Sequence, residues 1–190
     1  IRSNGEECVR ASALRFRVAD VPVSDYVKFS GEPPQLPKPL PFDLFRQAAE
    51  RDGFHHAIEV RMDLKAKPAV MWFRLKQPVL PELPATPLLR VALAADWTYS
   101  IPSIANRILA RESFGSQSFF GINPDTTVNL HRQPAGEWIG IQTHSTYDDL
   151  GAGTVMGQIF DERGPVGFST QTILVRGKDS GPMETKVKQG

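Results

Sequence analysis

Residues 153–176, GTVMGQIFDERGPVGFSTQTILVR, are typical of two β-strands joined by a tight turn. The DERG turn contains Gly164, which can adopt the positive φ that tight hairpins favour. In the second strand Gln171 alternates with Ile173 and Val175, so its amide is predicted to share a face with β-branched aliphatic side chains. A buried amide without a partner costs about 1–3 kcal/mol. Gln171 is therefore expected either to be satisfied by a neighbouring backbone group or to hold a water or a carbonyl oxygen.

From residue 53 onward the sequence predicts an α+β domain. The long helical stretch is TPLLRVALAADWTYSIPSIANRILA (86–110), with Thr86 as the N-cap and Pro87 at the first helical position. Proline removes a helical hydrogen bond, so a break or kink is expected between Asp96 and Pro102. A single helix of this kind has to bury its apolar face against one antiparallel sheet. Strands are predicted on both sides of it, over 55–64, 68–76, 126–133, 137–148, 153–161 and 165–176.

The residues before 53 have a different character. ECVRASALRFRV (7–18) alternates as one strand. PPQLPKPLP (33–41) can form neither a regular helix nor a central strand, so it predicts an extended, solvent-exposed, polyproline-like linker. FDLFRQAAERDG (42–53) predicts a short helix that stops at Gly53. We therefore divide the chain into a first segment (1–30), a linker with a short helix (31–52), a complete domain (53–178) and a disordered polar tail (179–190).

Composition excludes several classes of protein. A net charge of +1 argues against a nucleic-acid partner held by a basic field, and no apolar run reaches the length of a membrane helix. Neither a signal peptide nor an initiator methionine is present, and the single Cys8 fits a reducing, cytoplasmic compartment. The four histidines lack metal-ligand spacing. We expect no metal, no cofactor, no nucleic acid and no membrane association, and we expect the chain to be a piece of a longer protein.

Asp96 is the first candidate catalytic residue. It ends the run VALAAD and precedes Trp97 on the long helix. A carboxylate there either orients water or acts as a general base, or it caps a helical segment where the next one begins.

Asp125 and His131 are an alternative acid–base pair, in INPDTTVNLHRQP. Their spacing has a counterpart in hydratase-type dehydratases. However, on one strand six residues span about 20 Å, so the two could meet only through a turn. A turn residue before a strand is the better explanation of Asp125.

The motifs together resemble the C-terminal half of the acyl-CoA thioesterase II (TesB-like) family. The matching features are ALAADW on the helix, His131–Arg132, Glu137–Trp138, the glycine-rich bend 151–153, the run from Asp161 to Gly164, and Gln171 placed five residues before Arg176. Such proteins carry two hotdog domains, each a curved antiparallel sheet around a long helix. The resemblance implies that 53–178 is a whole second hotdog and that 1–30 are remnant strands of the first.

The resemblance also implies a hydrolytic site without a covalent intermediate. In the family an Asp on the helix, a Thr or Ser on the next strand and a Gln on the last strand hold the attacking water. These positions fall on Asp96, Asn123 and Gln171; Asn123 departs from the pattern, and Thr126 is a nearby alternative. Backbone N–H groups at the helix break are expected to stabilise the oxyanion.

The implied substrate is an acyl-CoA or another acyl thioester. We expect its acyl chain to be lined by Trp97, Ile101 and Phe168. The implied partner is a second copy of the chain, or the missing part of the first hotdog. The alternative functions are a catalytically silent acyl-CoA-binding hotdog and, less well supported, an enoyl-CoA hydratase or dehydratase.

Overall fold

The computed structural model describes residues 1–16, 22, 24, 33–45, 53–79, 81–82, 84–111 and 119–177. The chain divides into two compact units, Ile1–Gly31 and Glu32–Gly190. In the first unit, β1 (Arg2–Ser3) and β2 (Glu6–Glu7) form a two-stranded antiparallel sheet. Residues 8–16 belong to no helix or strand, so the strand predicted over 7–18 is wrong for the described residues. Alternation alone does not stabilise a strand, and the large apolar side chains of this stretch are exposed, namely Val9, Leu14 and Phe16.

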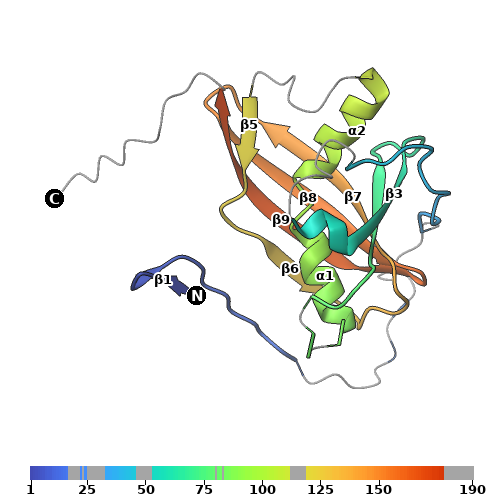
Figure 1. Cartoon of the computed structure of the whole chain (residues 1–190), viewed down its shortest axis with the longest axis horizontal. Helices are drawn as coiled ribbons and strands as arrows, with labels where there is room; N and C mark the ends of the chain where they lie inside the picture. Colours follow the sequence, from blue (N-terminus) through green and yellow to red (C-terminus); the bar gives the residue numbers. More distant parts are fainter. Residues whose placement is uncertain are drawn as a thin grey trace. The chain divides into compact units, whose positions relative to one another are not determined.

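The second unit contains one seven-stranded antiparallel sheet (Figure 1). Its strand order is β3-β4-β7-β8-β9-β5, and β6 also pairs with β9. The strands are β3 (Ile58–Asp63), β4 (Val70–Leu75), β5 (Phe119–Ile122), β6 (Thr127–Leu130), β7 (Ile139–Tyr147), β8 (Ala152–Asp161) and β9 (Gly164–Gly177). The last hairpin is confirmed, and Gly164 in its turn has a φ of 122°.

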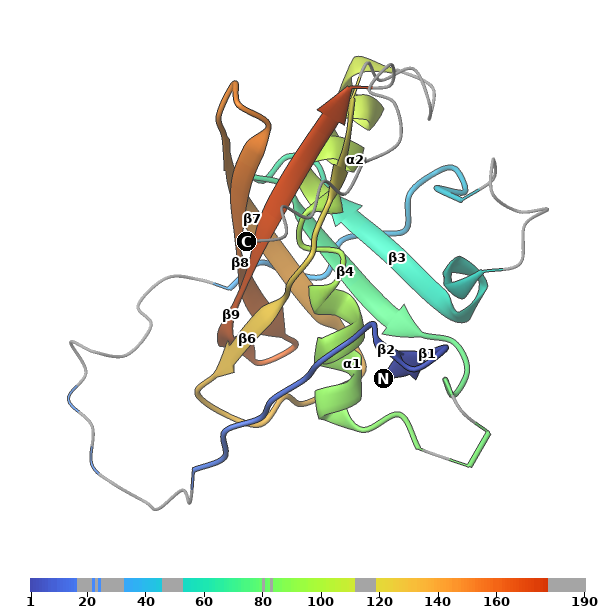
Figure 2. The same cartoon turned by 90° about the vertical axis from the view of Figure 1, so that its left-hand side faces the viewer.

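Two helices lie one after the other across one face of this sheet (Figures 1 and 2). α1 (Pro87–Ala95) begins at Thr86, whose hydroxyl accepts the Leu89 N–H at 3.2 Å, as the sequence predicts. The helical path breaks after Ala95 and resumes as α2 (Ser100–Ala110). The predicted break is therefore confirmed. A helix wrapped by a curved antiparallel sheet is the expected hotdog arrangement.

The main core lies between the helices and the sheet. It combines Met71 and Phe73 of β4, Ile141 of β7, and Val91 and Ile101 of the helices, all 5% exposed or less. Burying such aliphatic and aromatic side chains contributes about 1.5–3 kcal/mol each, and this fixes the helices on the sheet.

A second apolar cluster covers the opposite face of the sheet and corrects one prediction. Trp72, Trp138 and Phe160 pack there together with Leu36 of the proline-rich segment. Leu40 of the same segment, and Leu44 just after it, pack against the main core. Residues 33–41 are extended as predicted, yet they are not a wholly solvent-exposed spacer, because Leu36 and Leu40 are partly buried against the domain.

Other differences are local. Residues Phe54–Ala57 form a short 3-10 helix, η3, where a strand is predicted to begin, and β5 is a strand that the sequence does not predict. Most of the predicted helix 42–53 and the whole predicted tail 179–190 lie outside the described residues. Within the described ranges, no group of three metal-ligating side chains is found, and no helix is long and apolar enough to cross a membrane.

Candidate functional site

Gln171 lies on the inner face of β9, directly opposite the break between α1 and α2. Its side chain is 2% exposed, in line with the predicted strand face. Its Nε2 donates to Thr126 Oγ1 at 2.8 Å and to the backbone carbonyls of Asp96 at 3.2 Å and Ala95 at 3.3 Å. Its Oε1 accepts the backbone N–H of Tyr99 at 2.8 Å. Both ends of the amide are thus used to hold the helix break against the sheet.

The segment between β5 and β6 brings the other predicted catalytic residues to the same place. Asn123 follows β5 directly, and its Nδ2 donates to Asp96 Oδ1 at 3.2 Å. Thr126 precedes β6 and accepts from Gln171. The four residues predicted as catalytic are therefore linked by direct hydrogen bonds, with Asp96 and Thr126 exposed at the surface and Gln171 buried beneath them.

Asp125, in the same segment, has a structural partner on β9. β5 pairs with residues 174–177 of β9 and β6 pairs with residues 167–170, which leaves a gap between the two ladders. Asp125 Oδ1 accepts the Thr172 N–H at 2.8 Å in that gap. This bond supports the interpretation of Asp125 as a turn residue. His131 lies at the far end of β6, where its backbone N–H donates to Val166, and its hydrogen bond does not involve Asp125.

A buried hydroxyl pair lies beneath the helix break. Thr98 Oγ1 and Ser169 Oγ are 2.7 Å apart, both side chains are fully buried, and Thr98 Oγ1 is also 2.7 Å from the Ala95 carbonyl. Gly157 of β8 leaves room for this pair, because a Cβ there would lie 2.8 Å from Ser169 Oγ and 3.0 Å from a Thr98 methyl. Sequence reasoning missed this pair, although Ser169 shares the strand face of Gln171.

The backbone N–H groups at the helix break are predicted to stabilise an oxyanion, but in the structure they already have acceptors. Those of Trp97 and Thr98 donate to the Ala94 and Ala95 carbonyls, at 3.0 and 3.1 Å. The Tyr99 N–H is used by Gln171, and those of residues 100 and 101 donate to the Trp97 carbonyl. These five donors are all satisfied within the chain, so none of them is available to an oxyanion in this structure.

The three residues predicted to line the acyl chain lie in different places. Trp97 is half-buried, packs edge-on against Phe45 with ring centres 5.7 Å apart, and lines a cleft beside α2. Ile101 is fully buried in the main core. Phe168 is 43% exposed and lies on the face of β9 opposite to Gln171. The structure thus brings Trp97 alone of the three to the cleft beside the site.

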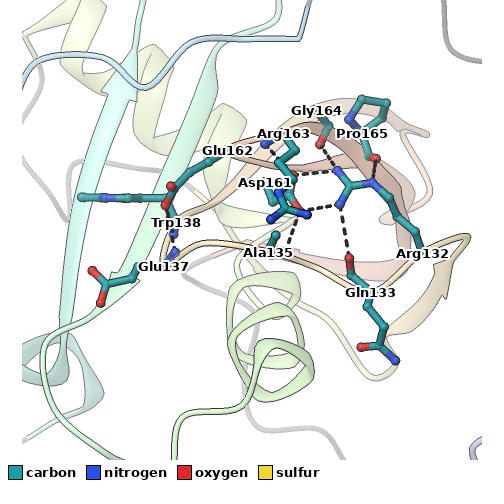
Figure 3. A network of polar contacts seen from close by, with 10 residues as sticks. All are labelled: Arg132, Gln133, Ala135, Glu137, Trp138, Asp161, Glu162, Arg163, Gly164 and Pro165. Carbon is teal, nitrogen blue, oxygen red and sulfur yellow. Dashed lines mark hydrogen bonds and ion pairs between the residues drawn. The ribbon is translucent and has the colours of Figure 1, made fainter.

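Arg132 and the run from Asp161 to Gly164 belong to a separate structural network (Figure 3). The Arg132 guanidinium makes two 2.6 Å bonds to Asp161, which is 1% exposed, and also donates to the Gly164 and Pro165 carbonyls. Asp161 further accepts the N–H groups of Ala135 and Arg163. The network ties the β6–β7 connection to the β8–β9 turn.

The electrostatics of this network follow from its contacts. Burial by itself raises the pKa of Asp161. The hydrogen bonds from Arg132, Ala135 and Arg163 outweigh burial and hold that pKa below its ordinary value. The pKa of Arg132 is raised, chiefly by its hydrogen bond to Asp161. Arg132 and Asp161 are therefore both charged, and they act as a structural ion pair rather than as an acid–base pair.

Family comparison decides how the site is interpreted. The model of the acyl-CoA thioesterase C-terminal domain matches residues 24–175. The chain belongs to this family. Comparison with curated proteins finds no matching sequence.

Solved structures show the same fold at low identity. A thioesterase from Haemophilus influenzae is 15% identical, with a TM-score of 0.50, over 75% of this chain and 96% of that one. The tesB protein of Mycobacterium avium subs paratuberculosis is 19% identical, with a TM-score of 0.48, over 81% of this chain. The chain spans 57% of that protein's length. The family match and the Haemophilus influenzae structure confirm the hotdog fold for this domain.

Proposed function

We propose that the chain hydrolyses acyl-CoA thioesters, with Asp96 as the general base. Four observations support this: Asp96 is exposed, it is held by Asn123, it stands on a helix break fixed by Gln171, and Gln171 is itself bonded to Thr126. The observation that carries the proposal is the Asp96–Asn123 bond in a member of the thioesterase family. The proposal extends to acyl-CoA as the substrate, while a cytoplasmic location and a homo-oligomer remain predictions.

The reaction uses one water. Its oxygen attacks the thioester carbonyl carbon while Asp96 takes one of its protons, which raises the nucleophilicity of the water. The carbonyl oxygen becomes an oxyanion, which the second N–H of Asn123 or the Thr126 hydroxyl can stabilise. The oxyanion then re-forms the carbonyl and the C–S bond breaks. The leaving sulfur takes the proton back from Asp96, and the products are a free acid and CoA. In this scheme Gln171 is a positioning residue, because its donors already hold Thr126 and the helix break.

The second candidate function is acyl-CoA binding without turnover. One observation favours it: the family's Thr or Ser is replaced by Asn123, whose amide cannot take over every role of a hydroxyl. The two functions share a substrate and differ only in the chemical step.

The test measures turnover and binding separately. CoA thiol release is followed with short-, medium- and long-chain acyl-CoAs, and binding of non-hydrolysable thioether analogues is measured by calorimetry. Hydrolysis at one or more chain lengths supports the proposal. Binding of the analogues without thiol release supports the silent binder and overturns the hydrolase, and hydration of an enoyl-CoA without thiol release overturns both.

A further inference from the structure

Ser169 and Thr98 form a hydroxyl pair that the proposed mechanism does not use. The two side-chain oxygens are 2.7 Å apart, and both side chains are fully buried. Ser169 lies on β9, two residues before Gln171 and on the same inner face of the sheet. Thr98 lies in the turn between α1 and α2, two residues after Asp96. The pair therefore connects the last strand of the sheet to the turn that carries the proposed general base.

The direction of this hydrogen bond follows from a third group, the backbone carbonyl of Ala95. A carbonyl oxygen only accepts hydrogen bonds, and Thr98 Oγ1 lies 2.7 Å from it, so the single hydroxyl hydrogen of Thr98 points to that carbonyl. The hydrogen shared by the two hydroxyls therefore belongs to Ser169. Ser169 donates to Thr98, and Thr98 donates to Ala95, the last residue of α1. In such a chain each hydrogen bond strengthens the next one.

β9 thus holds the turn around Asp96 with two side chains. Gln171 directly bonds two carbonyls at the end of α1 and the backbone N–H just before α2. Ser169 reaches the first of those carbonyls through Thr98. The hydroxyl pair also packs directly on the sheet, because a Cβ added to Gly157 of β8 would lie 2.8 Å from Ser169 Oγ and 3.0 Å from a Thr98 methyl. The exposed carboxylate of Asp96 therefore projects from a backbone that the buried hydroxyls help to fix.

We propose that Ser169 and Thr98 are positioning residues for hydrolysis, whose hydroxyl chain fixes the turn that presents Asp96 to the substrate. Both hydroxyls are fully buried, so they act on Asp96 through the backbone carbonyl of Ala95 and not by touching the substrate. A misplacement of about 1 Å can cost about a hundredfold in rate, so loss of the chain is expected to lower kcat and to change KM little. The inference rests on the proposed function, because it takes Asp96 to be the general base.

The test compares Thr98→Val, Thr98→Ser and Ser169→Ala in the hydrolysis of an acyl-CoA. Valine keeps the shape of threonine without its hydroxyl, so the Ala95 carbonyl loses a donor and the Ser169 hydroxyl loses its acceptor. We expect Thr98→Val to lower kcat about tenfold to hundredfold with KM little changed. Thr98→Ser keeps the hydroxyl and should restore most of the loss. Ser169→Ala leaves the bond to Ala95 in place, so its kcat should fall only about twofold to tenfold, the rate equivalent of one hydrogen bond.

The order of the chain is tested by the double variant Thr98→Val/Ser169→Ala. Because Ser169 acts only through Thr98, adding Ser169→Ala to Thr98→Val is expected to lower kcat no further. If the two single losses multiply instead, the hydroxyls act independently and the proposed chain is overturned.

Thr143→Val is the matched control for removing a buried hydroxyl. Thr143 lies on β7 and is 2% exposed, and its hydroxyl has no hydrogen-bond partner among the residues that the structure describes. Its kcat should equal that of the wild type. An equal fall in kcat for Thr143→Val and Thr98→Val would overturn the proposal, because the loss of any buried hydroxyl would then have the same effect.

Amide hydrogen exchange, measured by NMR, reports the order of the turn without any turnover. The backbone N–H groups at positions 97 and 98 donate to carbonyls at the end of α1. Thr98→Val and Ser169→Ala should speed the exchange of these two amides about fivefold or more relative to amides of β7, whereas Thr143→Val should not. Unchanged exchange at both positions would overturn the proposal.

The two measurements together separate this proposal from the proposed function. If no thioester is hydrolysed by the wild type, the proposed function fails, and the exchange rates still decide whether the hydroxyl chain fixes the turn. If Thr98→Val does not fold, Ser169→Ala is used for both measurements, and wild-type kcat and exchange in that variant would overturn the proposal.

Discussion

Tyr99 donates its backbone N–H to the side-chain oxygen of Gln171 at 2.8 Å. This one bond links the start of the second helical segment to the last strand of the sheet. The amide nitrogen of the same glutamine reaches the carbonyls of Ala95 and Asp96, on the other side of the break. Gln171 therefore spans the break from both sides, and the position of Asp96 depends on it.

Gln171→Met tests this dependence. The substitution keeps the length of the side chain but leaves the Tyr99 N–H without its acceptor, so we expect the free energy of unfolding to fall by about 1–3 kcal/mol. Hydrolysis should fall as well, because Asp96 loses its fixed position. Urea unfolding and thiol release measure the two effects. Gln158→Met, on the neighbouring strand, is the control; equal behaviour of the two variants would refute a special role for Gln171.

Gly157→Ala tests the hydroxyl pair beneath the break. A methyl group at this position approaches Ser169 Oγ and a Thr98 methyl within 3.0 Å, so one of them has to move. We expect a loss of about 1–3 kcal/mol in stability, as is typical of overpacking, and a lower kcat. Thermal unfolding and kinetics measure these changes. Met156→Ala, an exposed position on the same strand, should leave kcat unchanged, and an unchanged kcat in Gly157→Ala would show that the break tolerates displacement.

Asp161→Asn tests the network of Figure 3. Removing one charge of a buried pair costs about 3–5 kcal/mol, and since the Arg132 side chain is 31% exposed we expect a value near the lower end. The comparison of unfolding free energies at neutral pH measures this cost. Retention of wild-type stability by the variant would mean that the pair contributes nothing.

The stability that Asp161 provides is also expected to depend on pH. The pKa of Asp161 in the folded protein lies below its ordinary value of 3.8, so the folded state binds fewer protons there than the unfolded chain. The stabilisation is complete above that ordinary value and is lost as the pH falls through the folded pKa. The wild type should therefore lose its advantage over Asp161→Asn in acid. Urea unfolding across the acid range checks this, and a constant difference between the two would contradict it.

Asn123→Ala tests the proposed oxyanion donor. The change removes the bond to Asp96 Oδ1 and the second amide N–H, and losing one such donor typically costs about 100-fold or more in kcat. Asn123→Thr, which introduces the residue found in the family, should lose less because a hydroxyl can donate. Asn129→Ala on β6 is the control for a surface asparagine. Steady-state kinetics give kcat for the three variants. Equal kcat values for Asn123→Ala and Asn129→Ala would contradict the assignment of Asn123 as an oxyanion donor.

The sequence predicts those parts of the fold whose signals are local. The Thr86–Pro87 cap, the break before Pro102 and the turn at Gly164 each follow from the backbone preferences of one or two residues. The inward face of Gln171 follows from strand alternation. These features are all confirmed.

The missed features depend on contacts between distant residues. β5 is a four-residue strand formed only because β9 is long enough to pair with it beyond β6. Leu36 is partly buried because the opposite face of the sheet presents Trp72 and Trp138. Similarly, nothing in the sequence indicates that Gln171 bonds both Tyr99 and Thr126, because the partners lie 72 and 45 residues away. The residues themselves indicate Asp96 and Gln171 as separate candidates, whereas their combination with Asn123 in one site follows from the family resemblance.

The role of Asp96 is the central claim, and the matched pair Asp96→Asn and Asp125→Asn tests it most directly. Both are exposed aspartates beside the same strand, but Asp125 holds a backbone N–H, which an asparagine oxygen can still accept. The measurement is kcat for CoA thiol release from an acyl-CoA that the wild type hydrolyses. We predict a fall of about 10²–10⁴-fold for Asp96→Asn and little change for Asp125→Asn. Equal kcat values for Asp96→Asn and the wild type would contradict the account.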